Sequence, residues 1–394
     1  MDLKTFKEGS MRKFMEMKPE DSELFKYQTL FKDFEADPKI MEDAGIKVLQ
    51  KPDGVEIKNL DGSSDLLGNF DINDKFAQMN NAFFNSGTLI EVPRGAAGTI
   101  RISSSPENDV FRKLVVLAGE RSSIDIVKES YSPNENPGIV SEDVLVIAGP
   151  DSEITFSEFQ NYNYNSAVFS NKIAVCKSNS KVSWNLGLFG GGKSRSRTYN
   201  FLEGDGSYVE DLQLTFGDKE QNFDAFSNLV HIGRSTTARA LAKGVFKDKS
   251  SSIFKGMIRI KENAKNAGSY LACHGMLLSK SAKANAIPGL EIETNDVKAT
   301  HAASVSPIDE EKIFYLLSRG IDEQSARRMI TLGFFDPLIK GIKSDEIRAK
   351  IRYLIEMKWQ GQNTESFEEK MLKEYMTEDA IKSGDIFEGH YKYR

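Results

Sequence analysis

Short runs of alternating apolar and polar residues fill the middle of the chain, from residue 86 to about residue 306. Turns rich in Gly, Ser, Asn and Asp separate these runs, and this combination predicts β-strands. The runs recur, because Ile124, Ile154, Val182 and Val209 follow similar turns and lie 30, 28 and 27 residues apart. A repeat of this length indicates stacked coils, and therefore a β-solenoid and not a sandwich.

Helical patterns flank the β region on both sides. We therefore expect a mainly β protein in three parts: an N-terminal helical cap region (residues 1–85), a β-helix core (86–306) and a C-terminal helical domain (307–394). The inward face of one coil cannot be buried by that coil alone, so stacking supplies the core. Both open ends of the stack need covers that prevent edge-to-edge association, and the helical flanks are natural covers.

The N-terminal region contains two helical patterns. The segment 75–86 repeats apolar residues at helical spacing until Gly87, where a β region begins. Turn signals at 37–38 and 51–54 indicate short helices and a small strand or hairpin around 55–60. An earlier amphipathic helix is predicted from apolar residues at spacings of three and four, namely Leu24, Tyr27, Phe31 and Phe34.

Helix start and stop signals follow residue 306. Ser306 can cap a first helix, which Gly320 ends. A second helix begins at Asp322, and Gly333 and Pro337 are expected to interrupt it before a third helix. The plainest interpretation of the apolar stripes in these segments is packing within a small helical domain.

Charge and cysteine content narrow the possible functions. With 52 basic and 58 acidic residues the net charge is −6, so we expect neither nucleic acid nor an anionic membrane as the main partner. Cys176 and Cys273 are too few for a disulfide framework, and residues 1–13 lack the apolar core of a signal peptide. No apolar run reaches the ~20 residues that span a bilayer. We therefore expect a cytoplasmic protein.

Residues 187–194, Gly-Leu-Phe-Gly-Gly-Gly-Lys-Ser, match the phosphate-binding loop pattern G-x-x-x-x-G-K-(S/T). Such a loop works at the start of a helix, whereas no helical stripe follows here. The glycines therefore favour a tight solenoid corner, with no ATP bound by this chain. Arg195 and Arg197 are two residues apart, so on a strand both side chains would point to the same face. That face could equally well be exposed to solvent and have no binding role. Nucleotide binding by the isolated chain would revive the alternative, a nucleotide hydrolase.

Thiol and imidazole groups are the candidate metal ligands, and the chain places Cys273, His274 and His301 in its last predicted coils. His274 and His301 are 27 residues apart, within the repeat, so they can lie on adjacent coils about 4.8 Å apart and form a two-imidazole site. Cys273 should point to the opposite face from His274 unless a bulge intervenes. The alternative is that Cys273 is a small buried hydrophobe and His301 a satisfied edge histidine.

The segment 289–321 resembles the SufB/SufD family of iron–sulfur cluster assembly scaffolds. The resemblance lies in Leu-Glu-Ile (290–292), Asn-Asp-Val-Lys (295–298), Thr-His-Ala-Ala (300–303), Phe-Tyr-Leu (314–316) and Ser-Arg-Gly-Ile (318–321). Residues 75–95 also resemble the opening segment of the family core. The resemblance implies a right-handed parallel β-helix and a non-catalytic scaffold that carries a transient iron–sulfur cluster. ATP hydrolysis would then belong to a SufC-like ABC-type ATPase partner.

The resemblance also implies roles for particular residues. In this family a histidine lies at the interface with the SufB-like subunit. The resemblance assigns this role to His301, at an interface with a SufB-like subunit or with a second copy of the chain. SufB-type members have a sulfur-accepting Cys three residues before a Leu pair and glutamates around this histidine. Here His274 precedes Leu277-Leu278, and Thr300 and Ala302 flank His301, so the SufD type is favoured.

ATPase docking is expected on the segment 313–339. The candidate contact residues are Phe314, Tyr315, Arg319, Phe334 and Phe335. Two alternatives stay open. One is a sulfur-accepting, SufB-like or homodimeric protein that uses Cys273. The other is a β-helix carbohydrate-active enzyme, which the lack of a secretion signal disfavours.

Overall fold

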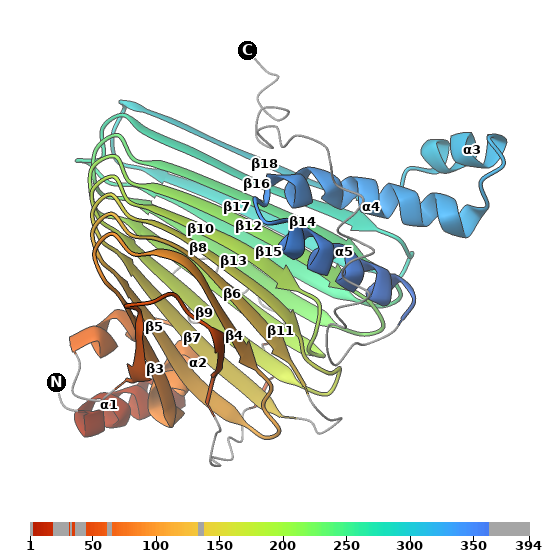
Figure 1. The fold of residues 1–394 in the computed structure, drawn as a ribbon. Helices are drawn as coiled ribbons and strands as arrows, with labels where there is room; N and C mark the ends of the chain where they lie inside the picture. The colour runs from red at the N-terminus through yellow and green to blue at the C-terminus, as the bar shows by residue number, and fades with distance from the viewer. Residues whose placement is uncertain are drawn as a thin grey trace.

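The computed structural model describes residues 3–18, 31, 34–35, 45–60, 65–132 and 138–361. Its centre is a parallel β-solenoid in which successive strands alternate between two nine-stranded sheets (Figure 1). Sheet A has the order β1-β4-β6-β8-β10-β12-β14-β16-β18, and sheet B has the order β17-β15-β13-β11-β9-β7-β5-β3-β2. The predicted mainly β fold with a parallel solenoid is confirmed, whereas its handedness and the three-part division of the chain stay predictions.

The strands of sheet A are β1 (Lys47–Gln50), β4 (Ala97–Ser104), β6 (Ser123–Tyr131), β8 (Glu153–Asn161), β10 (Lys181–Leu188), β12 (Tyr208–Gly217), β14 (Thr237–Phe246), β16 (Ala267–Leu277) and β18 (Val297–Pro307). Those of sheet B are β2 (Glu56–Asn59), β3 (Ser86–Val92), β5 (Val110–Ala118), β7 (Ile139–Ala148), β9 (Ala167–Cys176), β11 (Lys193–Leu202), β13 (Asn222–His231), β15 (Ser251–Ile260) and β17 (Lys283–Ile292). The helices are α1 (Leu3–Glu16), the 3-10 helix η1 (Asp65–Phe70), α2 (Lys75–Phe83), α3 (Glu310–Ser318), α4 (Glu323–Gly341) and α5 (Asp345–Trp359).

The sequence repeat corresponds to the coil. Ile124, Ile154, Val182 and Val209 are direct neighbours in the parallel register of sheet A. All four side chains point inward and are buried in one apolar cluster between the sheets. The repeat is therefore one residue position that recurs on each coil, as the sequence predicts.

The interior also holds ion pairs. On β6 the inward positions continue from Ile124 and Ile126 to Lys128, which forms buried ion pairs with Glu142 and Glu158. Burial alone would raise the pKa of Glu158, but Lys128 and Lys172 outweigh it and hold the pKa at about 2. Charges that leave water are tolerated only when they are paired, which explains why these side chains occur as a connected set.

Strands, and not helices, extend the N-terminal end of the stack. β1 pairs antiparallel with β4, and β2 pairs antiparallel with β3, so each sheet gains one strand that runs against the others. The small β structure predicted around residues 55–60 therefore exists as β2. Its strand is not half of a local hairpin, because β1 and β2 belong to different sheets.

The helices cover the outer faces of the sheets. Helix α2 packs on sheet B and α1 packs against α2, and α4 and α5 lie along sheet A (Figure 1). The expectation that helices cover the ends was wrong. Their position follows from outward apolar side chains that would otherwise face water, such as Phe169 under α2 and Phe216 beside α4. Phe31 and Phe34 join the first group, whereas Leu24, Tyr27 and the turn at 37–38 lie outside the described residues.

Residues 187–194 form a strand, a corner and the next strand. Gly187 belongs to β10 and Lys193 to β11, so no helix follows the glycines. A Cβ atom on Gly190 would lie 2.1 Å from the backbone nitrogen of Tyr162, and one on Gly192 would lie 2.0 Å from the carbonyl oxygen of Tyr164. The glycines are therefore required by close stacking of corners, as predicted from the sequence.

Arg195 and Arg197 share one face but are not solvated. Arg195 pairs with Asp74, which also caps α2 through the backbone N–H groups of Phe76 and Ala77. Arg197 pairs with Asp224, at 2.8 Å between Nη2 and Oδ1. Both arginines are nearly fully buried, and Arg195 also lies against the Phe76 ring of α2, so its pairing with Asp74 fixes α2 on sheet B.

The C-terminal helices differ in detail from the prediction. Ser306 is part of β18, and Asp309 caps α3 by accepting hydrogen bonds from two backbone N–H groups. Helix α4 runs through Gly333 and Pro337 without interruption. Local turn signals were outweighed here by the packing of α4 on the solenoid. None of the helices in the described ranges has an apolar stretch of the length that a membrane crossing requires.

Candidate functional site

Cys273 and His301 lie on the inner face of the last two strands of sheet A. The register of β16 and β18 is continuous, with Leu271 opposite His301 and Cys273 opposite Ala303. Leu271 and Cys273 belong to the interior cluster. Directly opposite residues of parallel strands point to the same side, so the His301 side chain is on the same inner face as the thiol.

The two groups are diagonal neighbours at the C-terminal end of the solenoid. Strand spacing and rise place their Cα atoms about 8 Å apart, within reach of an imidazole side chain. Cys273 is 7% exposed and lines a small pocket together with Gln213, Thr215 and Val305. His301 is exposed, since no further coil covers it among the described residues. The site is therefore a buried thiol beside an open imidazole.

His274 does not join this pair. It lies on the adjacent position to Cys273, so its side chain points to the outer face of sheet A, and its Nδ1 lies 2.7 Å from Oγ of Ser304. His274 is also three register positions from His301, about 10 Å along the strand. The predicted two-imidazole site was wrong, because the register separates the two histidines by three positions and places their side chains on opposite faces of sheet A.

Burial controls the chemistry of the thiol. It raises the pKa of Cys273 to about 12, so the sulfur is protonated at neutral pH. Metal ligation requires the thiolate, hence binding at this site would release a proton. Within the described residues no group of three His, Cys, Asp or Glu is arranged to hold a metal ion. Cys273 and His301 are two donor groups, a thiol and an imidazole, of the kinds that bind transition metals.

The strand that carries His301, β18, and the strand before it, β17, are edge strands of the two sheets. β17 pairs with β15 and β18 pairs with β16, and among the described residues neither has a partner on its other side. Three large apolar side chains near this edge are exposed: Leu290 (40%), Ile292 (42%) and Val305 (38%). An exposed edge with apolar side chains is a template for pairing with another chain. The sequence signal is β-strand alternation that continues to residue 306, after which the pattern becomes helical.

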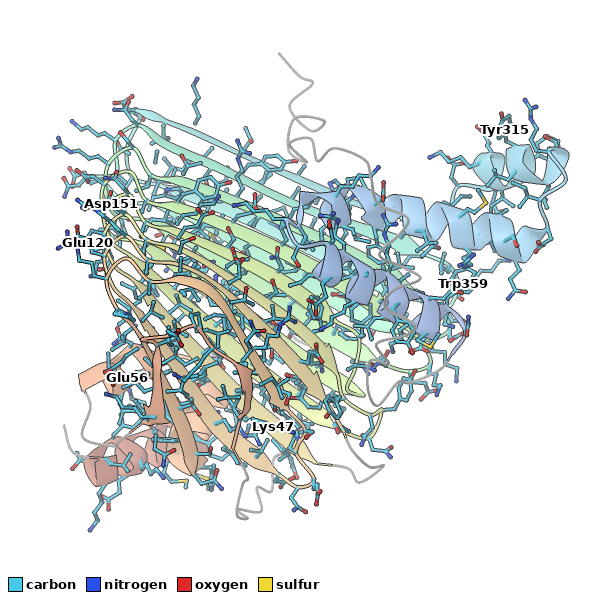
Figure 2. All side chains as sticks on the ribbon, viewed as in Figure 1. Lys47, Glu56, Glu120, Asp151, Tyr315 and Trp359 are labelled. Atoms are coloured by element: carbon cyan, nitrogen blue, oxygen red, sulfur yellow. The ribbon has the colours of Figure 1, made fainter. Side chains whose placement is uncertain are left out.

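The predicted ATPase-docking residues separate into two groups. Phe314 (73%) and Tyr315 (56%) are exposed on α3, which projects from the solenoid, and Arg319 lies 5.2 Å from the Tyr315 ring (Figure 2). Phe335 is fully buried against Phe216, and Phe334 packs partly in the same cluster. Phe335 therefore cannot contact a partner in this arrangement, because it lies on the face of α4 that packs on sheet A.

The α3 surface includes two residues of the segment 313–339 that were not among the predicted contact residues. Leu317 (42%) and Met329 (48%) are exposed on α3 and on the outer half of α4. We call Phe314, Tyr315, Leu317 and Met329 the α3 patch. The outer half of α4 extends beyond the solenoid together with α3, so these apolar side chains have no sheet beneath them (Figure 1).

The fold and the site define a β-solenoid protein with a thiol and an imidazole at an unpaired edge. Residues 100–334 match the family model described as SUF system FeS cluster assembly, SufBD core domain. This match covers more than half of the chain, and the chain therefore belongs to the SufBD family.

Individual relatives agree with this assignment. The chain is 29% identical over 295 residues to the iron–sulfur cluster assembly protein SufD of Bacillus subtilis. The aligned region covers 72% of this chain and 67% of SufD. It is 26% identical over 295 residues to SufB of the same organism, and the aligned region covers 73% of this chain and 63% of SufB. A SufBD family protein of Synechocystis sp. is 26% identical to this chain over 300 residues, and the aligned region covers 73% of this chain and 62% of that protein. The chain thus spans about two thirds of the length of these curated relatives.

Proposed function

We propose that this chain is a non-catalytic scaffold subunit of a SUF-type iron–sulfur cluster assembly complex. It pairs through β17 and β18 with a second SufB/SufD chain, either a SufB-like subunit or a second copy of itself. The α3 patch docks a SufC-like ABC-type ATPase, which hydrolyses the ATP. The cluster is a transient cargo that is built at the junction between the two scaffold chains.

One observation carries this proposal: the unpaired edge and the Cys273–His301 pair occur at the same end of the solenoid. Iron–sulfur clusters are held by thiolates and imidazoles, usually four protein ligands in all. The pair offers two, so a second chain that extends the sheet would also bring the remaining ligands. Edge pairing and cluster assembly then become a single event.

The SufB-like alternative is favoured by a specific observation, the shared inner face of Cys273 and His301. In that case the Cys273 thiolate would attack the outer sulfur of a donor protein's persulfide, so that a new S–S bond forms on Cys273 while the donor's S–S bond breaks and the donor leaves as a thiol. The buried, protonated thiol speaks against this role in the isolated chain, because the thiolate is the nucleophile. Both alternatives predict loss of the cluster in Cys273→Ser, so persulfide loading separates them. A persulfide that forms on the wild-type chain and is absent from Cys273→Ser favours the SufB-like role.

Anaerobic purification of the tagged chain from its native cell tests the proposal. We expect an ABC-type ATPase and a second SufB/SufD chain, or two copies of this chain, to be recovered in fixed ratio. The variant Leu290→Asp with Val305→Asp places charge at the edge and should lose the second scaffold chain but keep the ATPase. The matched variant Phe314→Ser with Tyr315→Ser should lose the ATPase but keep the second chain. Repeated recovery of a monomer without an ATPase would contradict the proposal.

The purified chain also allows the nucleotide hydrolase to be tested. Because residues 187–194 form a solenoid corner, we expect no saturable ATP binding by the chain alone. ATP binding that Lys193→Ala abolishes would revive that alternative.

A further inference from the structure

A cleft lies between the outer face of sheet A and the turn that joins α4 to α5. Strands β4, β6, β8, β10 and β12 form its floor, and residues 341–344 form its roof. The cleft has a volume of about 100 Å³. A cavity of about 150 Å³ holds a benzene ring, so this cleft has room for a molecule of about six non-hydrogen atoms.

The floor of the cleft consists of small polar side chains. Thr155 and Ser183 are opposite each other on β8 and β10, and Ser157 and Asn185 form the next outward-facing pair. Nδ2 of Asn185 donates a 3.0 Å hydrogen bond to Oγ of Ser157, whereas the hydroxyl groups of Thr155 and Ser183 have no hydrogen-bond partner among the described residues. A few free polar groups in a concave site are typical of ligand binding.

Two lysines share one carboxylate at one end of the cleft. Nζ of Lys343 lies 2.8 Å from Oε1 of Glu153, and Nζ of Lys181 lies 3.3 Å from the same oxygen. The hydrogen bond from Lys343, together with the charge of Lys181, holds the pKa of Glu153 below its ordinary value. One negative charge therefore faces two positive charges, and this end can still bind a carboxylate of a ligand.

Asp125 supplies a negative charge on the other side of the cleft. It is exposed, and among the described residues its carboxylate takes part in no hydrogen bond or ion pair. Asp125 faces the roof, because its charge contributes to raising the pKa of Lys343, after the larger effect of the hydrogen bond to Glu153. Two strand spacings and two residues separate Asp125 from Lys181, which places their Cα atoms about 12 Å apart. A short molecule with a charge at each end can bridge the side chains.

Other charged residues of the lining are already engaged. Nη1 of Arg101 donates a 2.6 Å hydrogen bond to Oε1 of Glu346, and Glu210 accepts one from the Tyr208 hydroxyl group. The groups that stay available are therefore the carboxylate of Asp125 and the ammonium groups of the lysine pair. A ligand with only one charge would satisfy one side of the cleft and be repelled by the other.

We propose that this cleft binds a small α-amino acid, with its ammonium group on Asp125 and its carboxylate on Lys181 and Lys343. The hydroxyl groups of Thr155 and Ser183 lie between the two charged ends, and the apolar lining residues Val127, Ile342 and Ile347 are available to an apolar side chain. The bound amino acid joins the turn between α4 and α5 to sheet A. Binding at this cleft needs neither the ATPase nor a second scaffold chain.

Isothermal titration calorimetry of the purified chain tests the ligand class. L-Alanine, with six non-hydrogen atoms, should bind saturably with a dissociation constant of about 1 mM or lower. Propionate lacks the ammonium group and ethylamine lacks the carboxylate, so each should bind about tenfold or more weakly. L-Tryptophan should not bind, because it is too large. Binding of propionate or ethylamine as tight as that of alanine would overturn the proposal, and so would the absence of saturable alanine binding.

Variants locate the binding. Asp125→Asn and Lys343→Met should each weaken alanine binding about tenfold or more, because each removes a charged partner. Ser183→Leu fills the floor and should abolish binding. Lys249→Met is the matched control, since it breaks a similarly exposed ion pair with Glu220 outside the cleft and should bind alanine as wild type does. Alanine binding that Asp125→Asn and Ser183→Leu leave unchanged would overturn the proposal.

Hydrogen exchange gives a second measurement of location. Alanine should slow the exchange of amides in residues 341–347 of the wild-type chain, because the ligand holds the roof against the floor. The same concentration should leave these amides unchanged in Ser183→Leu. Slower exchange confined to other segments of the wild-type chain would place the binding outside the cleft and overturn the proposal, while the proposed scaffold function would stand.

Discussion

Cys273 and His301 share the inner wall of the solenoid, whereas the imidazole next to Cys273 in sequence, His274, is on the outer wall. This arrangement assigns the two histidines different tasks. His301 can share a ligand set with the thiol, and His274 can contact only what lies outside the sheet. The open end of the coil leaves His301 accessible to a second chain.

Variants of Cys273, His274 and His301 should differ in the amount of iron–sulfur cluster that the complex holds after reconstitution. His301→Ala and Cys273→Ser should each lower the cluster content of the anaerobically reconstituted complex about tenfold or more, since even outer-shell partners of metal ligands act on that scale. His274→Ala should retain it, because its side chain is on the opposite face. Iron and sulfide analysis together with the visible absorption spectrum measures the content. Equal losses of cluster in all three variants would show that the cluster does not depend specifically on residues of the inner face of sheet A.

The reactivity of Cys273 should depend steeply on pH. Burial raises its pKa to about 12 from the ordinary value of 9, so the thiolate fraction, and with it the alkylation rate, should rise about tenfold for each pH unit between pH 7 and pH 10. The Cys176→Ser background leaves this single thiol for measurement with iodoacetamide. An unburied thiol would level off near pH 9, and a plateau there would show that Cys273 is open to solvent.

The buried pair of Arg195 and Asp74 should dominate the attachment of the N-terminal helices. Arg195→Met leaves the Asp74 carboxylate buried without its partner, which should lower the free energy of unfolding by about 3–5 kcal/mol. Arg94→Met removes the exposed pair with Glu120 and should cost less than about 1 kcal/mol. Urea unfolding measures both. Similar costs for the two variants would mean that the buried pair is not a structural link.

Neighbouring aromatic residues of the C-terminal helices should behave in opposite ways. Phe314→Ala, at an exposed position, should leave the free energy of unfolding within about 0.5 kcal/mol of wild type but weaken ATPase binding. Phe335→Ala should lower the free energy of unfolding by about 3–5 kcal/mol, because it empties a buried site beside Phe216. Denaturant titration and ATPase pull-down together distinguish the two. Normal ATPase binding by Phe314→Ala with Tyr315→Ala would place the docking surface elsewhere.

The coil repeat was predictable because one inward apolar position recurs at nearly constant spacing, as Ile124 and Ile154 illustrate. Alternation also placed Cys273 and His274 on opposite faces. What it could not supply was the exact register, and a spacing of 27 residues looked like one coil although the coil at this point runs from Leu271 to His301. A shift of three positions separates the two histidines.

Buried charge was the second limit. Alternation from Ile124 and Ile126 puts Lys128 inside the solenoid, yet lysine alone in a core is so costly that its position becomes plausible only with Glu142 and Glu158 in place. Those partners come from other coils. The same holds for Arg195, whose partner Asp74 is 121 residues away.

Cross-linking at the edge strand tests the central claim most directly. A photoreactive amino acid at Val305 of β18, in the complex purified from the native cell, should cross-link to a second SufB/SufD chain. The same group at Glu120, on a turn at the side of the solenoid away from α3, should not (Figure 2). Cross-links from position 120 and none from position 305 would contradict an assembly built on the open end.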